Sequence, residues 1–313
     1  MNVPILFLTY QRFHTAERVF SAIQKAQPPR LYFASNAPKS SNNEEVAKVD
    51  RVRSLLDRVD WPCEVKTRFL EKHLPVKQSV SSSLDWFFEH EEQGIILEDD
   101  CLPHPDFFTF CENLLDKYAT DERVFAITGN NFQKGVRRGD ASYYFSRYNH
   151  VWGWASWRRA WQKSDMDMRF WPEWKNSPAW KEFWHDPIAR KYWEIILGRM
   201  YRGKFTTWDY PWSASVWYHG GLTATPNVNL VSNIGFGQDA THTDDTGHPL
   251  ANMTTNAIGE VCHPTVVEQD GVADRFCFDH VFGGRSFRFP YFVFHLPRLV
   301  AKFAYRRILR LFS

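Results

Sequence analysis

Three adjacent carboxylates follow a short apolar run in the segment GIILEDDC, residues 94–101. The apolar run predicts a buried strand, and Glu98, Asp99 and Asp100 then stand at its carboxyl end. Because neighbouring like charges repel one another, we expect a cation to neutralise them. Carboxylates suit Mg²⁺ or Mn²⁺, and Mg²⁺ usually completes its shell with substrate phosphates. The run predicts a metal-bridged phosphate ligand; a polar turn, with Asp106 as a helix cap, is the alternative.

A further carboxylate, Asp209, lies among aromatic residues in the segment TTWDYPW, residues 206–212. Apolar neighbours raise the proton affinity of a carboxylate, which favours a role as a general base. The alternative is a helix cap, with the helix beginning near Tyr210 and Pro211 in its first turn. One side chain can fill both roles.

The elements that must position these residues alternate along residues 1–130. Apolar runs predict strands at 4–10, 30–36, 63–70, 94–97 and 124–129, and helical periodicity predicts helices at 15–26, 44–59, 76–91 and 106–119. This alternation predicts an α/β fold with a mostly parallel sheet flanked by helices. Ligands of such sheets bind outside the carboxyl ends of the strands, which is where the acidic triplet stands.

The rest of the chain differs in composition. Residues 141–217 are rich in tryptophan, and we expect them to be helical; residues 220–285 are rich in Gly, Asn, Thr and Asp, and we expect mainly loops there. The 14 tryptophans of the chain serve either as core or as platforms for sugar rings. The WGW spacing predicts that Trp152 and Trp154 lie on one side of an extended segment.

Bulk properties exclude several classes of protein. A formal net charge of +2 gives no reason to expect a nucleic-acid partner. The five cysteines are too few for a disulfide framework and match no common zinc spacing, which favours a reducing compartment. The N-terminus lacks the features of a signal peptide, and no apolar run reaches the ~18 residues of a membrane span. We therefore expect a cytoplasmic protein.

The C-terminal residues 286–313 form a basic segment of their own. Arg298, Lys302, Arg306 and Arg310 recur every four residues between apolar positions. This pattern predicts a basic amphipathic helix. Such a helix either binds an anionic membrane surface, which would place the protein on the inner face of the cell membrane, or packs on the domain with its basic edge in solvent.

Several segments together carry a family resemblance that spans roughly residues 3–285. They are PILFLTYQR (4–12), GIILEDDCLPHPDFF (94–108), DERVFAITGNNF (121–132), WGWASWRRAW (152–161), TTWDYPW (206–212) and NIGFGQDATHT (233–243). In this order they resemble the bacterial nucleotide-sugar glycosyltransferases of the GT-A fold, which are distantly similar to the N-acetylglucosaminyltransferase I group. The resemblance implies a Rossmann-like GT-A domain, Mn²⁺ or Mg²⁺, and a Trp-rich acceptor region.

The resemblance also implies roles for individual residues. On the donor side these are Thr9, Arg12, Asn36, Glu98 and Asp99, and Lys77 is a further sequence candidate for a phosphate contact. Asp100 would bind the metal, and His242 would meet the metal or the diphosphate. Asp209 would be the general base, and the acceptor would contact Trp152, Trp154 and Trp208. Asn36 stands where relatives often have an Asp-Gly-Pro turn.

We expect residues 1–135 to form a nucleotide-sugar-binding half, residues 136–285 the acceptor-binding and catalytic half of the same domain, and residues 286–313 the basic helix. The expected function is an inverting, metal-dependent hexosyl or N-acetylhexosaminyl transfer. The expected donor is a UDP-sugar, and the expected acceptor is a glycan or glycolipid in surface polysaccharide biosynthesis. A metal-dependent nucleotidyltransferase is one alternative, but the residues after the first strand, LTYQRFHTAER, lack the glycines of a phosphate loop. A non-catalytic carbohydrate-binding protein is the other, and it would not need the acidic triplet.

Overall fold

The N-terminal half alternates strands and helices as the sequence predicts. The computed structural model describes residues 1–236 and 249–293. The strands of this half are β1 (Ile5–Thr9), β2 (Arg30–Ser35), β3 (Glu64–Phe69), β4 (Gln93–Glu98) and β6 (Val124–Thr128), and its helices are α1 (Phe13–Ala26), α2 (Asn43–Arg53), α3 (Val76–His90) and α4 (Pro105–Lys117). The helix expected at 44–59 ends earlier than predicted, and its last turn is the 3₁₀ helix η1 (Ser54–Arg58).

The rest of the described chain adds further strands and helices. The strands are β5 (Cys101–Pro103), β7 (Tyr143–Ser146), β8 (Trp154–Trp157), β9 (Leu222–Pro226) and β10 (Val231–Asn233). The helices are α5 (Arg158–Trp161), α6 (Trp171–Trp174), α7 (Pro178–Phe183), α8 (Pro187–Tyr201), α9 (Asp209–Tyr218), α10 (Gly271–His280) and the 3₁₀ helix η2 (Gly284–Phe287).

The segment 141–217 is therefore not wholly helical, because it contributes β7 and β8. A short strand buried on both faces has no alternating pattern and cannot be told from a helix segment by periodicity. The segment 220–285, in which we expected mainly loops, likewise contains β9, β10 and α10.

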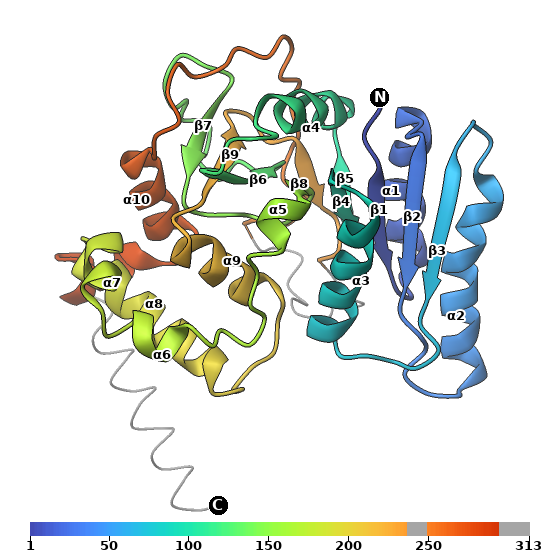
Figure 1. The fold of residues 1–313 in the computed structure, drawn as a ribbon, viewed down its shortest axis with the longest axis horizontal. Helices are drawn as coiled ribbons and strands as arrows, with labels where there is room; N and C mark the ends of the chain where they lie inside the picture. The colour runs from blue at the N-terminus through green and yellow to red at the C-terminus, as the bar shows by residue number, and fades with distance from the viewer. Residues whose placement is uncertain (237–248, 294–313) are drawn as a thin grey trace, which may run out of the picture.

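An eight-stranded sheet runs through the described protein in the order β3-β2-β1-β4-β8-β6-β9-β7 (Figure 1). Strands β3, β2, β1 and β4 are parallel neighbours, and β6 is parallel to β9. Strands β8 and β7 run antiparallel to their neighbours. The fold is thus α/β with a mostly parallel, mixed sheet. Because β8 lies between β4 and β6, one sheet joins residues 1–135 to residues 136–285.

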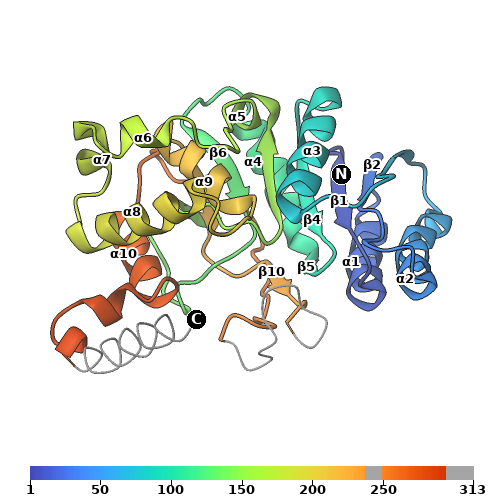
Figure 2. The same cartoon turned by 90° about the horizontal axis from the view of Figure 1, so that it is seen from below.

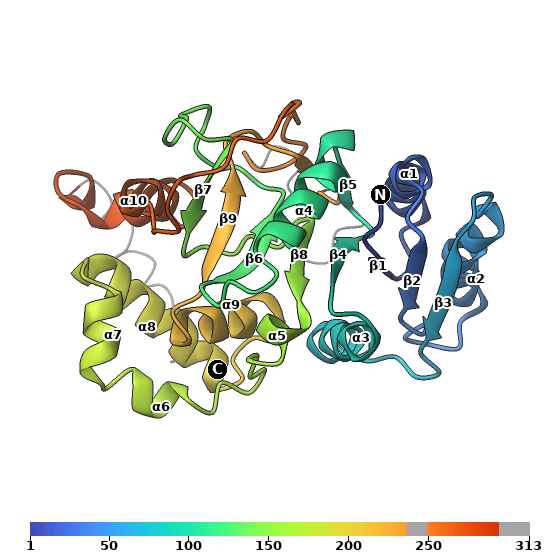
Figure 3. The same ribbon diagram turned by 45° about the horizontal axis from the view of Figure 1, so that its top comes forward.

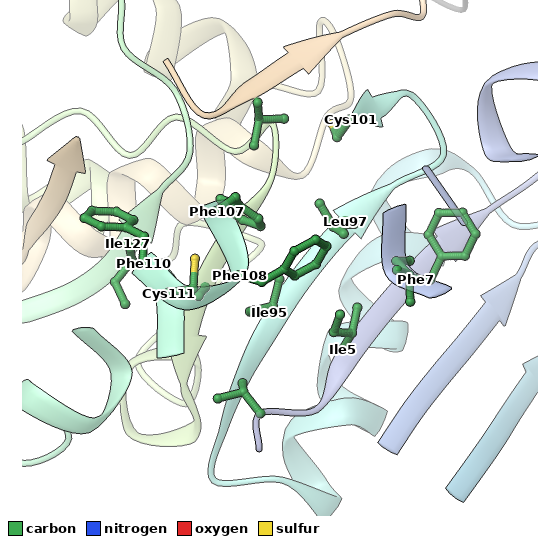
Figure 4. Close-up of a cluster of buried hydrophobic side chains, with 14 of the residues drawn as sticks. Ile5, Phe7, Ile95, Leu97, Cys101, Phe107, Phe108, Phe110, Cys111 and Ile127 are labelled. Atoms are coloured by element: carbon green, nitrogen blue, oxygen red, sulfur yellow. The ribbon is translucent and has the colours of Figure 1, made fainter. Parts of the chain in front are cut away.

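Helices cover both faces of this sheet (Figure 3). Alternate residues of β1 point to opposite faces, so Ile5 and Phe7 belong to one buried cluster and Leu6 and Leu8 to the other. The first cluster includes α1 and α4; Figure 4 shows the side chains of β1, β4 and α4 gathered in it. The second cluster includes α3 and the Trp-rich helices. These two cores hold the strand ends in fixed register.

Tryptophan forms much of the second core. Among the largest fully buried side chains are Trp154, Trp171, Trp180, Trp193, Trp212 and Trp217. Their rings contact one another edge-to-face or tilted, as in the pair Trp193–Trp217, whose centroids lie 4.8 Å apart. Such pairs stabilise by about 0.5–1.5 kcal/mol beyond area burial. The tryptophan excess is therefore mainly a packing feature, and sugar contact is left to the rings that line a cavity.

Two expectations lie wholly or largely outside the described residues. His242 falls in the segment 237–248, and most of the basic segment 286–313 falls in 294–313. The metal role of His242 and the amphipathic C-terminal helix stay predictions. Among the helices in the described part of the chain, none is both long and apolar enough to cross a membrane.

Candidate active site

The carboxyl ends of β1 and β4 lie next to each other and bring Arg12 to the acidic triplet. The two strands are parallel neighbours, with Leu8 opposite Glu98. Arg12 follows β1 at the N-cap of α1, and its Nη2 donates hydrogen bonds to Asp99 Oδ1 and to Asp100 Oδ2, the latter at 2.9 Å. The guanidinium thus joins two of the three carboxylates.

The other two oxygens of Asp99 and Asp100 also have hydrogen-bond donors. The backbone N–H of Tyr10 donates to Asp99 Oδ2 at 3.3 Å, and the Cys101 thiol donates to Asp100 Oδ1 at 3.4 Å. Hydrogen bonds to the charged form are what a buried carboxylate such as Asp99 needs. Local protein groups therefore supply part of the neutralisation that the sequence had suggested a metal would provide.

One guanidinium does not neutralise all three carboxyl groups at this edge. Burial raises the pKa of Glu98, and the charges of Asp100 and Asp99 raise it further, whereas Arg12 opposes the rise. Burial also raises the pKa of Asp99 against the effect of Arg12. Three carboxylates share one guanidinium, so the edge can accept additional positive charge.

A divalent cation fits this edge only together with a ligand. In residues 1–236 and 249–293 no group of three or more His, Cys, Asp or Glu side chains could hold a metal ion by itself. The space between Asp99 and Asp100 already holds a positive group, and carboxylate oxygens suit Mg²⁺ or Mn²⁺. Asp100, the more exposed of the two, is the residue that would bind the cation, while phosphate oxygens would complete its shell.

The segment after β10 covers these carboxylates. Strand β10 pairs with β5 directly behind the triplet, with Asn233 opposite Cys101 (Figure 2), and the Ile234 N–H donates to the Asp100 carbonyl at 2.8 Å. A Cβ on Gly235 would lie 2.2 Å from Asp100 Oδ2 and 2.7 Å from Arg12 Nη1. Only glycine can approach so closely. No local pattern in the sequence indicates this contact.

A second feature is a cavity of about 170 Å³ that Asp209 lines. Its walls include the rings of Trp152, Trp193, Tyr210 and Trp217. Asp209 is the first residue of α9, where the helix dipole favours a negative charge, and the Thr207 hydroxyl donates to Asp209 Oδ1. The N-cap of α9 is Trp208 and no side chain makes a cap hydrogen bond there, so the helix-cap alternative is wrong, while the role of Asp209 as a general base stays a prediction.

The cavity adjoins the acidic edge in two ways. The charge of Asp209 is near enough to Glu98 to contribute to the raised pKa of that residue. In addition, the Trp152 ring meets the Phe236 ring edge-to-face, with centroids 5.8 Å apart, and Phe236 follows the glycine that covers Asp100. A ligand at the edge and a ligand in the cavity would therefore be neighbours.

The other donor-side candidates bond to groups outside the triplet. Thr9 Oγ1 donates to the Ala34 carbonyl at 3.1 Å. The Asn36 amide donates to the Leu74 carbonyl at 2.8 Å and accepts from two backbone N–H groups, so it ties the end of β2 to the segment before α3. Lys77 pairs with Asp167 at 3.2 Å and lines a separate cavity of about 230 Å³ that includes no residue of the triplet.

The three acceptor-side tryptophans do not share one environment. Trp152 lines the cavity, whereas Trp154 and Trp208 are buried and stack on each other with centroids 5.8 Å apart. Gly153, between the first two, has a φ of +67°, so the segment is not extended there and the expectation of a common side is wrong. We retain Trp152 alone as an acceptor-side candidate.

Sequence reasoning missed Asn149 and Ser213, which also line the cavity. Neither stands in a motif with a characteristic spacing, and no local pattern distinguishes them from surface polar residues. Their position follows from how the segment between β7 and β8 packs with α8 and α9 around the cavity, which links residues remote in sequence.

No protein-family model matches the sequence, and neither does any curated protein. Solved structures with a similar chain trace include mouse xyloside xylosyltransferase 1 in its apo form, with 12% identity, a TM-score of 0.36 and coverage of 71% of this chain and 84% of that one. The glycosyltransferase GlyE of Streptococcus pneumoniae TIGR4 has 10% identity, a TM-score of 0.33 and coverage of 72% and 45%.

A third similar structure is 4-diphosphocytidyl-2C-methyl-D-erythritol synthase of Anaerococcus prevotii, with 9% identity, a TM-score of 0.37 and coverage of 72% and 88%. Similarity at this level gives no basis for transferring an activity to this chain. The functional argument therefore depends on the residues of the edge and the cavity.

Proposed function

We propose that this protein is a glycosyltransferase that moves a sugar from a nucleotide-diphosphate donor to a glycan or glycolipid acceptor. The observation that carries the proposal is the position of Asp209. This carboxylate lines an aromatic cavity, and the Trp152 ring of the same cavity contacts Phe236, the neighbour of the glycine that covers Asp100. A base for an acceptor hydroxyl and a binding edge for a diphosphate are then adjacent, as one-step glycosyl transfer requires.

In this reaction an acceptor hydroxyl oxygen in the cavity attacks the anomeric carbon of the donor sugar. The bond from that carbon to the diphosphate oxygen breaks, and its electron pair leaves on the diphosphate. Asp209 takes the proton of the hydroxyl. Attack from the side opposite the leaving group inverts the anomeric configuration, so the proposal predicts an inverted product.

The donor diphosphate binds at the carboxyl ends of β1 and β4 in this proposal. Asp100 would hold a Mn²⁺ or Mg²⁺ ion together with the diphosphate, and Glu98 and Asp99 would contact the ribose or the water molecules of the ion. When bound, such an ion stabilises the charge that develops on the leaving diphosphate. Arg12, already at this edge, is the side chain best placed for the phosphates. A UDP-sugar is the first donor to test.

A thermal-shift screen tests the donor half of the proposal. UDP and UDP-sugars should raise the melting temperature of the protein in the presence of MnCl₂, because ligands that bind the folded state stabilise it. Asp100→Ala should abolish this shift. If the protein instead only binds carbohydrate, Asp100→Ala should leave its sugar binding intact, and no nucleotide should produce a shift at any MnCl₂ concentration.

A product assay tests the catalytic half. Donors that shift the melting temperature would be incubated with a panel of glycan and glycolipid acceptors, and the anomeric configuration of the product read by NMR. An inverted glycoside supports the proposal, whereas nucleotidyl transfer to a sugar phosphate would assign the protein to the other class of enzyme.

A further inference from the structure

The amide of Asn149 is an exception among the buried polar side chains. Asn149 is 6% exposed, yet neither its Nδ2 nor its Oδ1 has a hydrogen-bond partner in the described part of the chain. Most buried polar atoms in folded proteins are hydrogen-bonded, and leaving one unpaired is costly. An amide that lacks both a donor and an acceptor partner needs an explanation in terms of what it binds.

The position of Asn149 supplies one. Asn149 lines the same cavity as Asp209, together with the hydroxyl-bearing Ser213 and the Trp152 ring. The cavity of about 170 Å³ has the volume of roughly five or six water molecules at about 30 Å³ each, which suits a single sugar ring. Aromatic rings beside a few polar groups are a usual setting for a small ligand.

We propose that Asn149 recognises the acceptor: one pyranose ring of the acceptor occupies this cavity, and the Asn149 amide hydrogen-bonds a neighbouring donor and acceptor on that ring. Such a pair is provided either by two adjacent hydroxyls or by an N-acetyl group. This inference rests on the proposed function, since it places the reacting ring beside Asp209. It makes Asn149 a specificity-determining residue and leaves proton removal to Asp209.

A second buried asparagine provides the matched control. Asn131 is also 6% exposed, but its Nδ2 donates to the Pro226 carbonyl at 2.6 Å and its Oδ1 accepts from the Gln133 N–H at 2.9 Å. Asn131 does not line the cavity. Its amide is engaged in the fold, whereas that of Asn149 has no such partners among the described residues. The two asparagines should therefore respond oppositely to the same substitution.

The first measurement is stability. Asn→Leu keeps the approximate shape and removes the amide. Asn149→Leu should leave the melting temperature unchanged or raise it, because it removes two unpaired polar atoms. Asn131→Leu should lower it by about 2–4 °C or more, because its two backbone partners lose their hydrogen bonds. A fall as large for Asn149→Leu as for Asn131→Leu would show that Asn149 is structural and overturn the proposal.

The second measurement is sugar binding, with methyl glycosides of hexoses and of N-acetylhexosamines as probes and ligand-observed NMR as the readout. The wild-type protein should bind at least one of the two series, and the preferred series identifies the recognised group. Asn149→Leu should weaken that binding about tenfold or more, whereas Asn131→Leu, measured below its melting temperature, should not. Equal binding by wild type and Asn149→Leu, or no binding of either series by wild type, would overturn the proposal.

Failure here is distinguishable from failure of the proposed function. Nucleotide binding at the acidic edge is measured separately, by the MnCl₂-dependent thermal shift with UDP-sugars. If that shift occurs but Asn149→Leu binds sugars normally, the transferase proposal stands and the role of Asn149 is rejected. If no nucleotide binds, whereas the methyl glycosides do, the cavity is a sugar site of a protein that is not a transferase.

Discussion

The acidic edge and the aromatic cavity differ in whether their buried polar atoms have hydrogen-bond partners. At the edge, all four carboxylate oxygens of Asp99 and Asp100 have a donor from the protein. In the wall of the cavity, both polar atoms of the Asn149 amide stay unpaired. Of nine buried side-chain N and O atoms without a partner in the described residues, eight belong to residues 130–223. The edge is a completed network that a ligand must rearrange, while the cavity offers unused hydrogen-bonding capacity.

The difference follows from the kind of structure that builds each region. The ends of parallel strands bring backbone N–H groups and helix starts close together, so charges find partners there. The second core is packed from large rings, and four indole N–H groups, those of Trp154, Trp180, Trp184 and Trp212, are buried in it without partners. Ring burial stabilises this region through area and ring contacts and outweighs the cost of these unpaired groups.

The largest effect should come from the carboxylate of the cavity that lies near the edge. Asp209→Asn removes the base and keeps the size of the side chain, so kcat at saturating donor should fall by about 10²–10⁴-fold. Nucleotide binding should persist, because the edge is intact. Asp167→Asn, a change at an exposed carboxylate of the other cavity, is the matched control and should leave kcat unchanged. Normal turnover by Asp209→Asn would show that Asp209 is not the general base.

Next in size is the loss of the edge's internal cation. Arg12→Met leaves Asp99 buried without its cationic partner, and the free energy of unfolding should fall by about 3–5 kcal/mol without divalent cations. MnCl₂ should raise the melting temperature of this variant more than that of the wild type, because the ion replaces the missing positive charge.

The exposed pair Arg58–Glu17, with a separation of 2.7 Å, provides the control for Arg12. Arg58→Met should cost at most about 1 kcal/mol and gain nothing from MnCl₂ beyond the wild-type response. An equal MnCl₂ response in all three proteins would mean that the carboxylates of the edge do not take up a cation when Arg12 is removed.

A smaller effect is expected from adding a methyl group at Gly235, which lies where the two regions meet. In Gly235→Ala the added methyl group meets Asp100 and Arg12 and must displace them. We expect kcat/KM to fall by about 10–100-fold, since small misplacements of a binding group are costly. Gly271→Ala, where a Cβ has open space at the start of α10, is the control. Equal activity of the two variants would contradict the close approach at position 235.

The smallest expected effect is a pH dependence of stability that comes from a histidine in the cavity wall. Burial lowers the pKa of His150, in the cavity wall beside Cys277, to about 3. The unfolded chain therefore binds a proton between about pH 6.5 and 3 that the folded protein does not, and stability falls as the pH falls below 6.5.

Between pH 7.5 and 5.5 the free energy of unfolding of the wild type should fall by about 1 kcal/mol more than that of His150→Gln, as measured by urea unfolding at each pH. A parallel loss in both proteins would show that His150 titrates normally in the fold.

Much of the N-terminal half could be predicted from local pattern, and less of the site. The strand ending at Glu98 and the helix of residues 15–26 follow from periodicity, which reports burial on one or both faces. The strand at 154–157 could not be recognised, because its residues are all buried and tryptophan occurs in helices as well. The partner of Asp99 could not be read either, since Arg12 lies 87 residues away.

The sequence by itself determined that three carboxylates end a buried strand, and that Asp209 starts a helix among aromatic residues. Periodicity, capping and strand polarity are local properties, so neighbouring residues are enough to specify them. The tertiary structure alone decided that Arg12 joins Asp99 to Asp100, that Gly235 covers them, and that Asn149 lines a cavity with Asp209. Those contacts join residues far apart in the chain, and only the packing of the sheet and its helices places them together.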